Sequence, residues 1–89
     1  MSNPQPGLLE FPTAFPIKIM GLHQPGLRES VLQAVRLADP AFDTTTLEER
    51  ISREGRYLGL TVTIMATSQR QLDDLYRALG ALPLVKVVL

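Results

Sequence analysis

The 89-residue sequence contains no cysteine, a single histidine and no excess of either charge. Without cysteine it has no disulfide framework, no thiolate nucleophile and no cysteine-based zinc site, a composition consistent with the cytoplasm. One histidine cannot form a multi-histidine site, so we expect neither a metal nor another cofactor. Because nine Lys and Arg balance nine Asp and Glu, the sequence also lacks the basic surface by which proteins hold the phosphates of nucleic acids.

Long apolar runs are missing as well. None approaches the roughly 18 residues of a membrane span, and the N-terminus lacks the basic start and apolar stretch of a signal peptide. We therefore expect a cytoplasmic protein with no membrane partner. Pro, Gly and polar residues dominate positions 1–7, which predicts a flexible tail. Residues 8–89 are then sufficient for one domain with one core.

Four segments show the apolar alternation of β-strands. The alternation is regular in residues 14–20 and 56–67, which indicates two strands that each bury one face. Residues 84–89 form a short apolar strand at the end of the chain. Residues 45–53 alternate more weakly between apolar and charged side chains, which predicts an exposed edge strand whose register is open.

Two further segments have the period of an amphipathic helix. Residues 25–38 carry one apolar stripe, and Pro25 suits the first helical turn because its missing amide hydrogen costs nothing there. Residues 68–79 carry a second stripe. They begin with a capping box, in which the Ser68 and Gln71 side chains satisfy free amides at the helix start.

The predicted order is therefore β-α-β-β-α-β. It closes most simply as an α+β, ferredoxin-like two-layer sandwich with an antiparallel sheet in order 4-1-3-2 and both helices on one face. The other sheet face is partly apolar, so we expect a cover. The candidates are residues 8–12 of the same chain, a second copy of the protein, or a partner protein. The expected interaction residues on this face are Lys18, Met20, Thr61, Thr63, Leu84, Lys86 and Val88.

Ferredoxin-like folds serve several functions, so individual residues must decide between them. An acylphosphatase-like enzyme needs an asparagine near the phosphate, and the only one is Asn3 in the predicted tail. An RNA-recognition domain needs several exposed aromatic rings on its central strands, where this sequence offers Tyr57. Asp73 and Asp74 point about 100° apart on a helix, and the i, i+4 spacing pairs Asp73 with Arg77 and Asp74 with Arg70, which predicts a solvated surface. We expect no enzyme, with a small enzyme for an anionic substrate as the remaining alternative.

The predicted hairpin between residues 45 and 67 carries a cluster of charge. Arg50, Arg53 and Arg56 are interleaved with three glutamates, which predicts a mixed-charge edge that keeps the protein soluble. A docking patch for an acidic partner is the alternative interpretation.

The residue types in the turn between the first strand and the first helix indicate a site for a small ligand. Gly21 and Gly26 allow a sharp bend and an approach to the helix amides, and His23 can contact a ligand. The alternative is a plain structural turn. The candidate ligand-binding residues are Gly21, His23, Pro25 and Gly26.

An ordered set of positions between residues 10 and 89 has the spacing of a known family. These positions are Glu10-Phe11-Pro12-Thr13, Phe15, Lys18, Met20, Gly21, Gly55, Tyr57, residues 61–67, Leu75, Tyr76, Leu79, Gly80 and Val88-Leu89. Through them the chain resembles the YbeD-like family of small bacterial proteins, a domain of unknown function. The resemblance implies a βαββαβ sandwich that has been likened to ACT domains, which bind amino acids and regulate metabolic enzymes.

The segment His23-Gln24-Pro25-Gly26-Leu27 is also similar to the ACT turn, typically Asp-x-Pro-Gly-Leu. His23 replaces the usual acidic residue, and an imidazole cannot hold a ligand's ammonium group as a carboxylate would. These resemblances imply a non-enzymatic regulatory module that senses a small molecule, such as an amino acid or carboxylate, or binds a protein. The alternatives are a pure adaptor and a homo-oligomerisation domain without a ligand.

Overall fold

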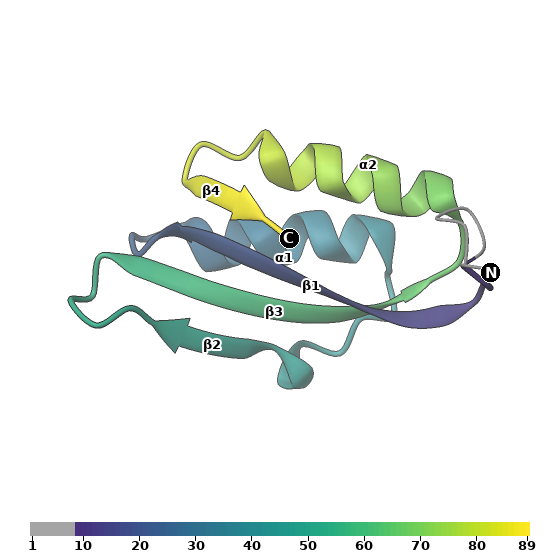
Figure 1. Cartoon of the computed structure of the whole chain (residues 1–89), viewed down its shortest axis with the longest axis horizontal. Helices are drawn as coiled ribbons and strands as arrows, with labels where there is room; N and C mark the ends of the chain where they lie inside the picture. The colour runs from purple at the N-terminus through teal and green to yellow at the C-terminus, as the bar shows by residue number, and fades with distance from the viewer. Residues whose placement is uncertain (1–8) are drawn as a thin grey trace, which may run out of the picture.

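The computed structural model describes residues 9–89, and their order of elements is the predicted one (Figure 1). The four strands form one antiparallel sheet in the order β2-β3-β1-β4, which is the predicted order counted from the other edge. The predicted tail, residues 1–7, lies outside the described residues, as does Leu8. The elements are β1 (Thr13–Leu22), α1 (Leu27–Ala38), β2 (Glu48–Ile51), β3 (Tyr57–Ala66), α2 (Gln69–Gly80) and β4 (Val85–Val88), with a 3-10 turn at Thr44–Thr46.

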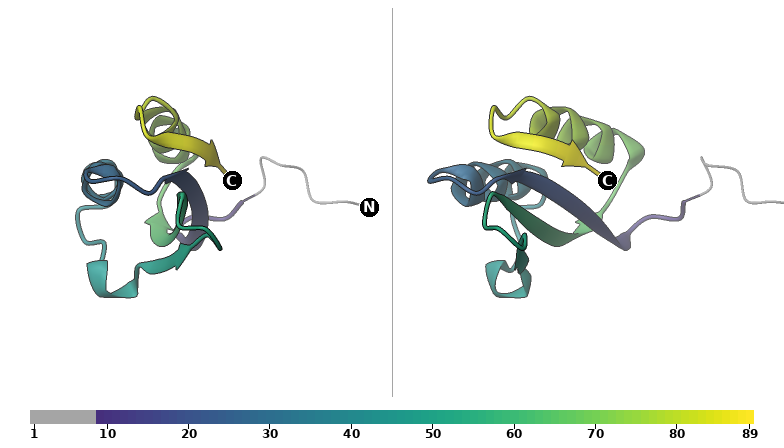
Figure 2. Two further views of the ribbon diagram at one scale, coloured as in Figure 1. Left: turned by 90° about the vertical axis from the view of Figure 1, so that its left-hand side faces the viewer. Right: turned by 60° about the vertical axis from the view of Figure 1, so that its left-hand side comes forward.

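Both helices cover the same face of the sheet, so the molecule has two layers (Figure 2). The core lies between them because β1 and β3 alternate as expected. Ile17 lies opposite Val62 and Ile19 lies opposite Leu60, and all four side chains are buried. The buried residues of the two helices complete this core, and they are Leu27, Val31, Leu32, Val35, Leu72, Leu75 and Leu79. Among residues 9–89, no helix has the length and apolar character to cross a membrane.

Strand β2 is shorter than the sequence indicates, because residues 44–46 form a 3-10 turn. The Asp43 carboxylate accepts hydrogen bonds from the Thr45 hydroxyl (2.6 Å) and the Thr45 amide (2.9 Å). The hydroxyl bond is the main cause that lowers the pKa of this carboxyl. Asp and Thr side chains bond readily to nearby backbone, and here that local bonding replaces the predicted strand start.

Two residues in and next to β4 that were predicted on the open face, Leu84 and Val88, lie on the core side instead. Val88 lies opposite the buried Ile19 and packs against the core, as does Leu84. The pairing of β1 with β4 shifts by one residue between Met20 and Gly21, which is a β-bulge. The extra residue in β4 reverses which face of the sheet the following residues of that strand occupy. Val87 therefore lies opposite Met20 on the open face, and Lys86 is an exposed residue within the bulge.

Helix α2 is fastened by the predicted capping box and by a further role of Gln71. The Ser68 hydroxyl accepts from the Gln71 amide (3.0 Å), and the Gln71 Oε1 accepts from the Thr67 amide (2.7 Å). The Gln71 Nε2 also donates to the carbonyls of Ala38 (2.9 Å) and Met65 (3.2 Å). One side chain thus joins α2 to the ends of α1 and β3.

The outer face of α2 is solvated, as predicted, although its ion pairs differ in detail. Asp74 lies 3.8 Å from Arg70 and 3.1 Å from Arg77. Asp73 instead accepts a hydrogen bond from Gln69 (3.0 Å), so the predicted pairing of Asp73 with Arg77 is wrong. Because this face of α2 lies away from the open face of the sheet, substitutions on it can serve as controls for substitutions on the open face.

Candidate interaction site on the open sheet face

The first turn, where a ligand was predicted, is built from tight structural contacts. Gly21 is buried, and a Cβ added there would lie 2.6 Å from the Leu84 carbonyl oxygen and 2.7 Å from the Leu27 Cδ1. The glycine is thus needed for the close packing of β1 against α1 and the segment before β4. Gly26 caps α1 with a φ of 96°, a conformation that favours glycine.

His23 connects the first turn to the β2–β3 hairpin. Its Nδ1 lies 3.1 Å from the Gly55 carbonyl oxygen, and its amide donates to the Arg56 carbonyl (2.8 Å). His23 and Pro25 are both exposed. The structure therefore gives Gly21, Gly26 and His23 structural roles, and ligand binding at this turn stays a prediction.

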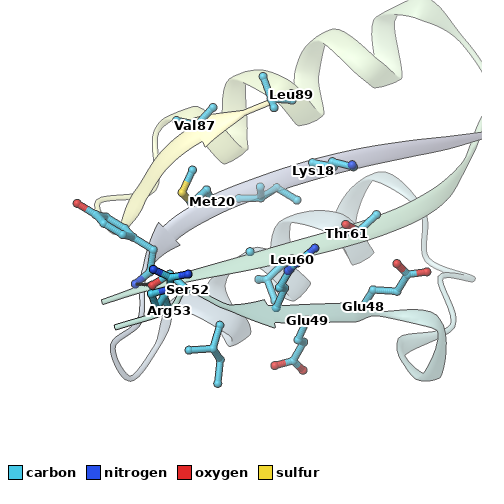
Figure 3. Close-up of a pocket in the computed structure, with 15 residues that line it drawn as sticks. Lys18, Met20, Glu48, Glu49, Ser52, Arg53, Leu60, Thr61, Val87 and Leu89 are labelled. Carbon is cyan, nitrogen blue, oxygen red and sulfur yellow. Dashed lines mark hydrogen bonds between the residues drawn. The ribbon is translucent and has the colours of Figure 1, made fainter. Parts of the chain in front are cut away.

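The open face of the sheet carries a shallow groove of about 930 Å³ (Figure 3). It crosses the second half of β1 and the first half of β3, with β2 on one side and β4 on the other. Its residues are Lys18, Ile19, Met20, Glu48, Glu49, Arg50, Ile51, Ser52, Arg53, Tyr57, Gly59, Leu60, Thr61, Val87 and Leu89.

One side of the groove is apolar. Met20, Val87 and Leu89 expose 41%, 39% and 71% of their surfaces, and Figure 3 shows them together along β1 and β4. Residues 9–12 do not line the groove, and Phe11 packs against the core instead. The described part of the predicted N-terminal cover therefore leaves this apolar strip uncovered.

The opposite side of the groove is charged and belongs to β2 and the residues that follow it. Glu48 lies opposite Thr61 and Arg50 lies opposite Gly59, so both face the open side. Glu49 faces the helices, where the Arg28 Nε donates to its carboxylate at 2.7 Å. Within residues 9–89, no ion pair neutralises Lys18, Arg50, Arg53 or Glu48. Three cationic side chains and one carboxylate side chain of the groove are thus available to a partner.

Gly59 forms the floor between the two sides. Gly59 lies opposite Met20 on β1 and opposite Arg50 on β2, so these three residues form a row across the strands. Because glycine has no side chain, the row is open at its centre. A Cβ added there would meet only the Arg50 carbonyl oxygen, at 3.5 Å, which is an ordinary contact. Neither space nor backbone conformation requires this glycine, whose φ is not positive. A glycine inside a strand weakens it and often marks the close approach of another molecule.

The model of a family described as "Protein of unknown function (DUF493)" matches residues 6–89. The chain belongs to the DUF493 family. A UPF0250 protein of Ralstonia nicotianae is 54% identical over 86 residues, which cover 97% of this chain and 89% of that protein. UPF0250 proteins of Leptothrix cholodnii and Nitrosomonas europaea are 52% and 56% identical over 82 residues, covering 92% of this chain and 90% and 94% of theirs. The predicted resemblance to the YbeD-like family is thereby confirmed.

In this DUF493 domain, the groove brings together only part of the predicted interaction face. Lys18, Met20 and Thr61 line it, whereas Thr63 lies further along the open face of β3. Leu84 and Val88 pack against the core, as described above. The groove also contains Arg50 and Arg53, for which a docking patch was the alternative interpretation, and Tyr57, Gly59, Val87 and Leu89, which were not predicted as interaction residues.

Two sequence signals point to these additional residues. A glycine within an otherwise regular strand could have identified Gly59 as an opening in the face. The cluster of arginines in the predicted hairpin includes two groove residues, Arg50 and Arg53. Among the described residues, no group of three or more His, Asp or Glu side chains could hold a metal ion. The apolar side and the cations of the groove are suited to recognition by apolar contact and by positive charge.

Proposed function

We propose that this domain is a non-enzymatic cytoplasmic interaction module, and that its groove binds an acidic segment of a partner protein. The observation that carries the proposal is an apolar strip that residues 9–89 leave uncovered, beside three cations, Lys18, Arg50 and Arg53, that have no ion-pair partner among those residues. A patch that is both apolar and charged typically serves recognition. Its positive charge exceeds its free negative charge although the whole chain is neutral, so the surface selects for an acidic partner.

A second copy of this chain fits the groove less well. In a two-fold, face-to-face dimer each copy would bring Lys18, Arg50 and Arg53 but, among the described groove residues, a single free carboxylate side chain, Glu48. Two positive surfaces would thus oppose each other, which costs free energy when they lose water. A partner that supplies carboxylates avoids this cost.

Photo-crosslinking inside the native cell tests the proposal. A photoreactive amino acid replaces Thr61, which lines the groove, and in a matched control it replaces Asp73 on the outer face of α2. We expect a heterologous protein to be crosslinked from position 61 well above the level from position 73. The double variant Arg50→Glu and Arg53→Glu should reduce this product, because carboxylates would then repel the acidic segment.

Three outcomes would overturn the proposal. The first is a product from position 61 that contains only a second copy of the chain, which would show a homo-oligomer. The second is no product above the control level. The third is a heterologous product that the Arg50→Glu, Arg53→Glu variant captures equally well, because that partner would not be recognised by charge.

A further inference from the structure

The row Met20, Gly59, Arg50 crosses the centre of the groove, and the missing side chain of Gly59 leaves a gap in it. Adjacent strands lie about 4.8 Å apart, so β1 and β2, which flank β3, are separated by about 10 Å. A flat ring with ordinary contacts of about 3.5–4 Å on each face fills such a gap. The gap therefore has the width of one aromatic side chain standing on edge.

The two walls of the gap also have the chemistry that favours an aromatic ring. Met20 supplies a polarizable sulfur that contacts rings favourably. Arg50 supplies a guanidinium group that stacks on an aromatic face and, within residues 9–89, has no ion-pair partner that would hold it elsewhere. An aliphatic side chain would gain neither interaction to the same extent.

The ends of the gap are closed by the neighbouring residues of β3 on the same face. Tyr57 and Thr61 are both half-buried, and they lie two residues before and after Gly59. Lys18 lies opposite Thr61, and Arg53 follows Ser52, whose hydroxyl accepts a hydrogen bond from the Tyr57 amide. Cations thus stand around the gap, where they can reach carboxylates next to the inserted ring in the partner's sequence.

From this geometry we infer that the Gly59 gap receives one aromatic side chain of the partner, flanked in the partner's sequence by Asp or Glu. The inference rests on the proposed function and names the residue types that the groove selects. A nucleic-acid strand would also offer rings and negative charge. Glu48 in the groove repels its phosphates, however, and the one aromatic ring among the described groove residues, the half-buried Tyr57, offers little stacking surface.

Synthetic peptides test the inference by NMR titration of the 15N-labelled chain. One nonapeptide has a central Phe with Asp and Glu on both sides, a second has Ala in place of Phe, and a third keeps Phe but has Lys in place of every acidic residue. We expect the first to bind about tenfold more tightly than the second, and to shift the amide signals of Gly59, Met20 and Arg50. The third peptide should not bind.

Two variants locate the aromatic preference. Gly59→Val fills the gap with a side chain that suits a strand, so the two acidic peptides should bind it with similar affinity. Thr63→Val is the matched control, because it adds the same side chain to the same strand and face outside the groove, and it should keep the tenfold preference. Met20→Ala removes one wall without touching Gly59 and should reduce the preference several-fold, which tests the gap independently of Gly59→Val.

The outcomes separate the inference from the proposed function. If wild-type protein binds the Phe and Ala peptides equally, or if Gly59→Val keeps the preference, the aromatic gap is wrong while binding of acidic segments stands. If no acidic peptide shifts signals on the open face, both fail. A single-stranded oligothymidylate that shifts the same signals at lower concentration than the acidic Phe peptide would replace the protein segment with a nucleic acid and overturn both.

Discussion

Two glycines of the central strands show how differently the same residue acts in one sheet. Gly21 is buried beneath the Leu84 carbonyl and the Leu27 side chain, whereas a Cβ at Gly59 would make only an ordinary contact, with the Arg50 carbonyl oxygen, on the open face. The first glycine permits the packing of the core, and the second leaves a surface opening. The difference is testable because an added methyl group would overlap a backbone oxygen at Gly21, at 2.6 Å, and would make an ordinary contact at Gly59, at 3.5 Å.

We predict that Gly21→Ala destabilises the protein by about 1–3 kcal/mol, because its Cβ would overlap atoms at 2.6 and 2.7 Å, one of them a backbone oxygen. Gly59→Ala is the control. It should leave the free energy of unfolding unchanged or raise it by about 0.5–1 kcal/mol, since alanine loses less freedom than glycine in a strand. Urea denaturation of both variants measures the difference, and equal stabilities would contradict the assigned roles.

At the scale of elements, regular periodicity predicted the fold well. The alternation in β1 and β3 and the stripes of α1 and α2 each depend on burial of one face, and a sequence displays that directly. Strand β2 was predicted too long because the hydrogen bonds of Asp43 to Thr45 favour a turn over a strand. Local bonds of this kind compete with alternation, and the pattern alone does not rank them.

The site was harder to predict because it depends on register between strands. A single bulge opposite Met20 and Gly21 moved Val88 into the core and Val87 onto the open face. Likewise, the sequence shows the hairpin arginines next to glutamates, but only the fold shows that Arg28 engages Glu49 and that Arg50 faces Gly59. Residues far apart in sequence define the groove, so its chemistry appears only once the strands are aligned.

Gln71 provides a prediction about how the elements are held together. Gln71→Ala should lower the free energy of unfolding by about 1–3 kcal/mol, because the Thr67 amide and the Ala38 and Met65 carbonyls lose a partner at once. Gln69→Ala, which removes only an exposed hydrogen bond to Asp73, should change it by less than about 0.5 kcal/mol. Thermal and urea unfolding of the two variants compare them, and a Gln71→Ala variant as stable as Gln69→Ala would refute the fastening role.

At the scale of the whole molecule, the chain is neutral but its charges are unevenly distributed. The outer face of α2 pairs Asp74 with Arg70 and Arg77, and Arg28 pairs with Glu49 on the helix side of β2. The groove keeps Lys18, Arg50 and Arg53 without such partners in the described residues. A neutral protein can therefore present one positive surface, and the long-range attraction of an acidic segment to it must depend on salt.

We predict that the affinity for the acidic Phe peptide falls about tenfold between about 20 mM and about 0.5 M salt, as the Debye length shortens from about 20 Å to about 4 Å. Each of three exposed ion pairs contributes up to about 1 kcal/mol, and a loss of about 1.4 kcal/mol in total is tenfold. Titrations at several salt concentrations measure the slope. Met20→Ala should weaken binding at every concentration with the slope unchanged, because it removes apolar contact alone. Arg50→Glu with Arg53→Glu should flatten or reverse the slope, and a slope that this variant leaves intact would show that other cations attract the peptide.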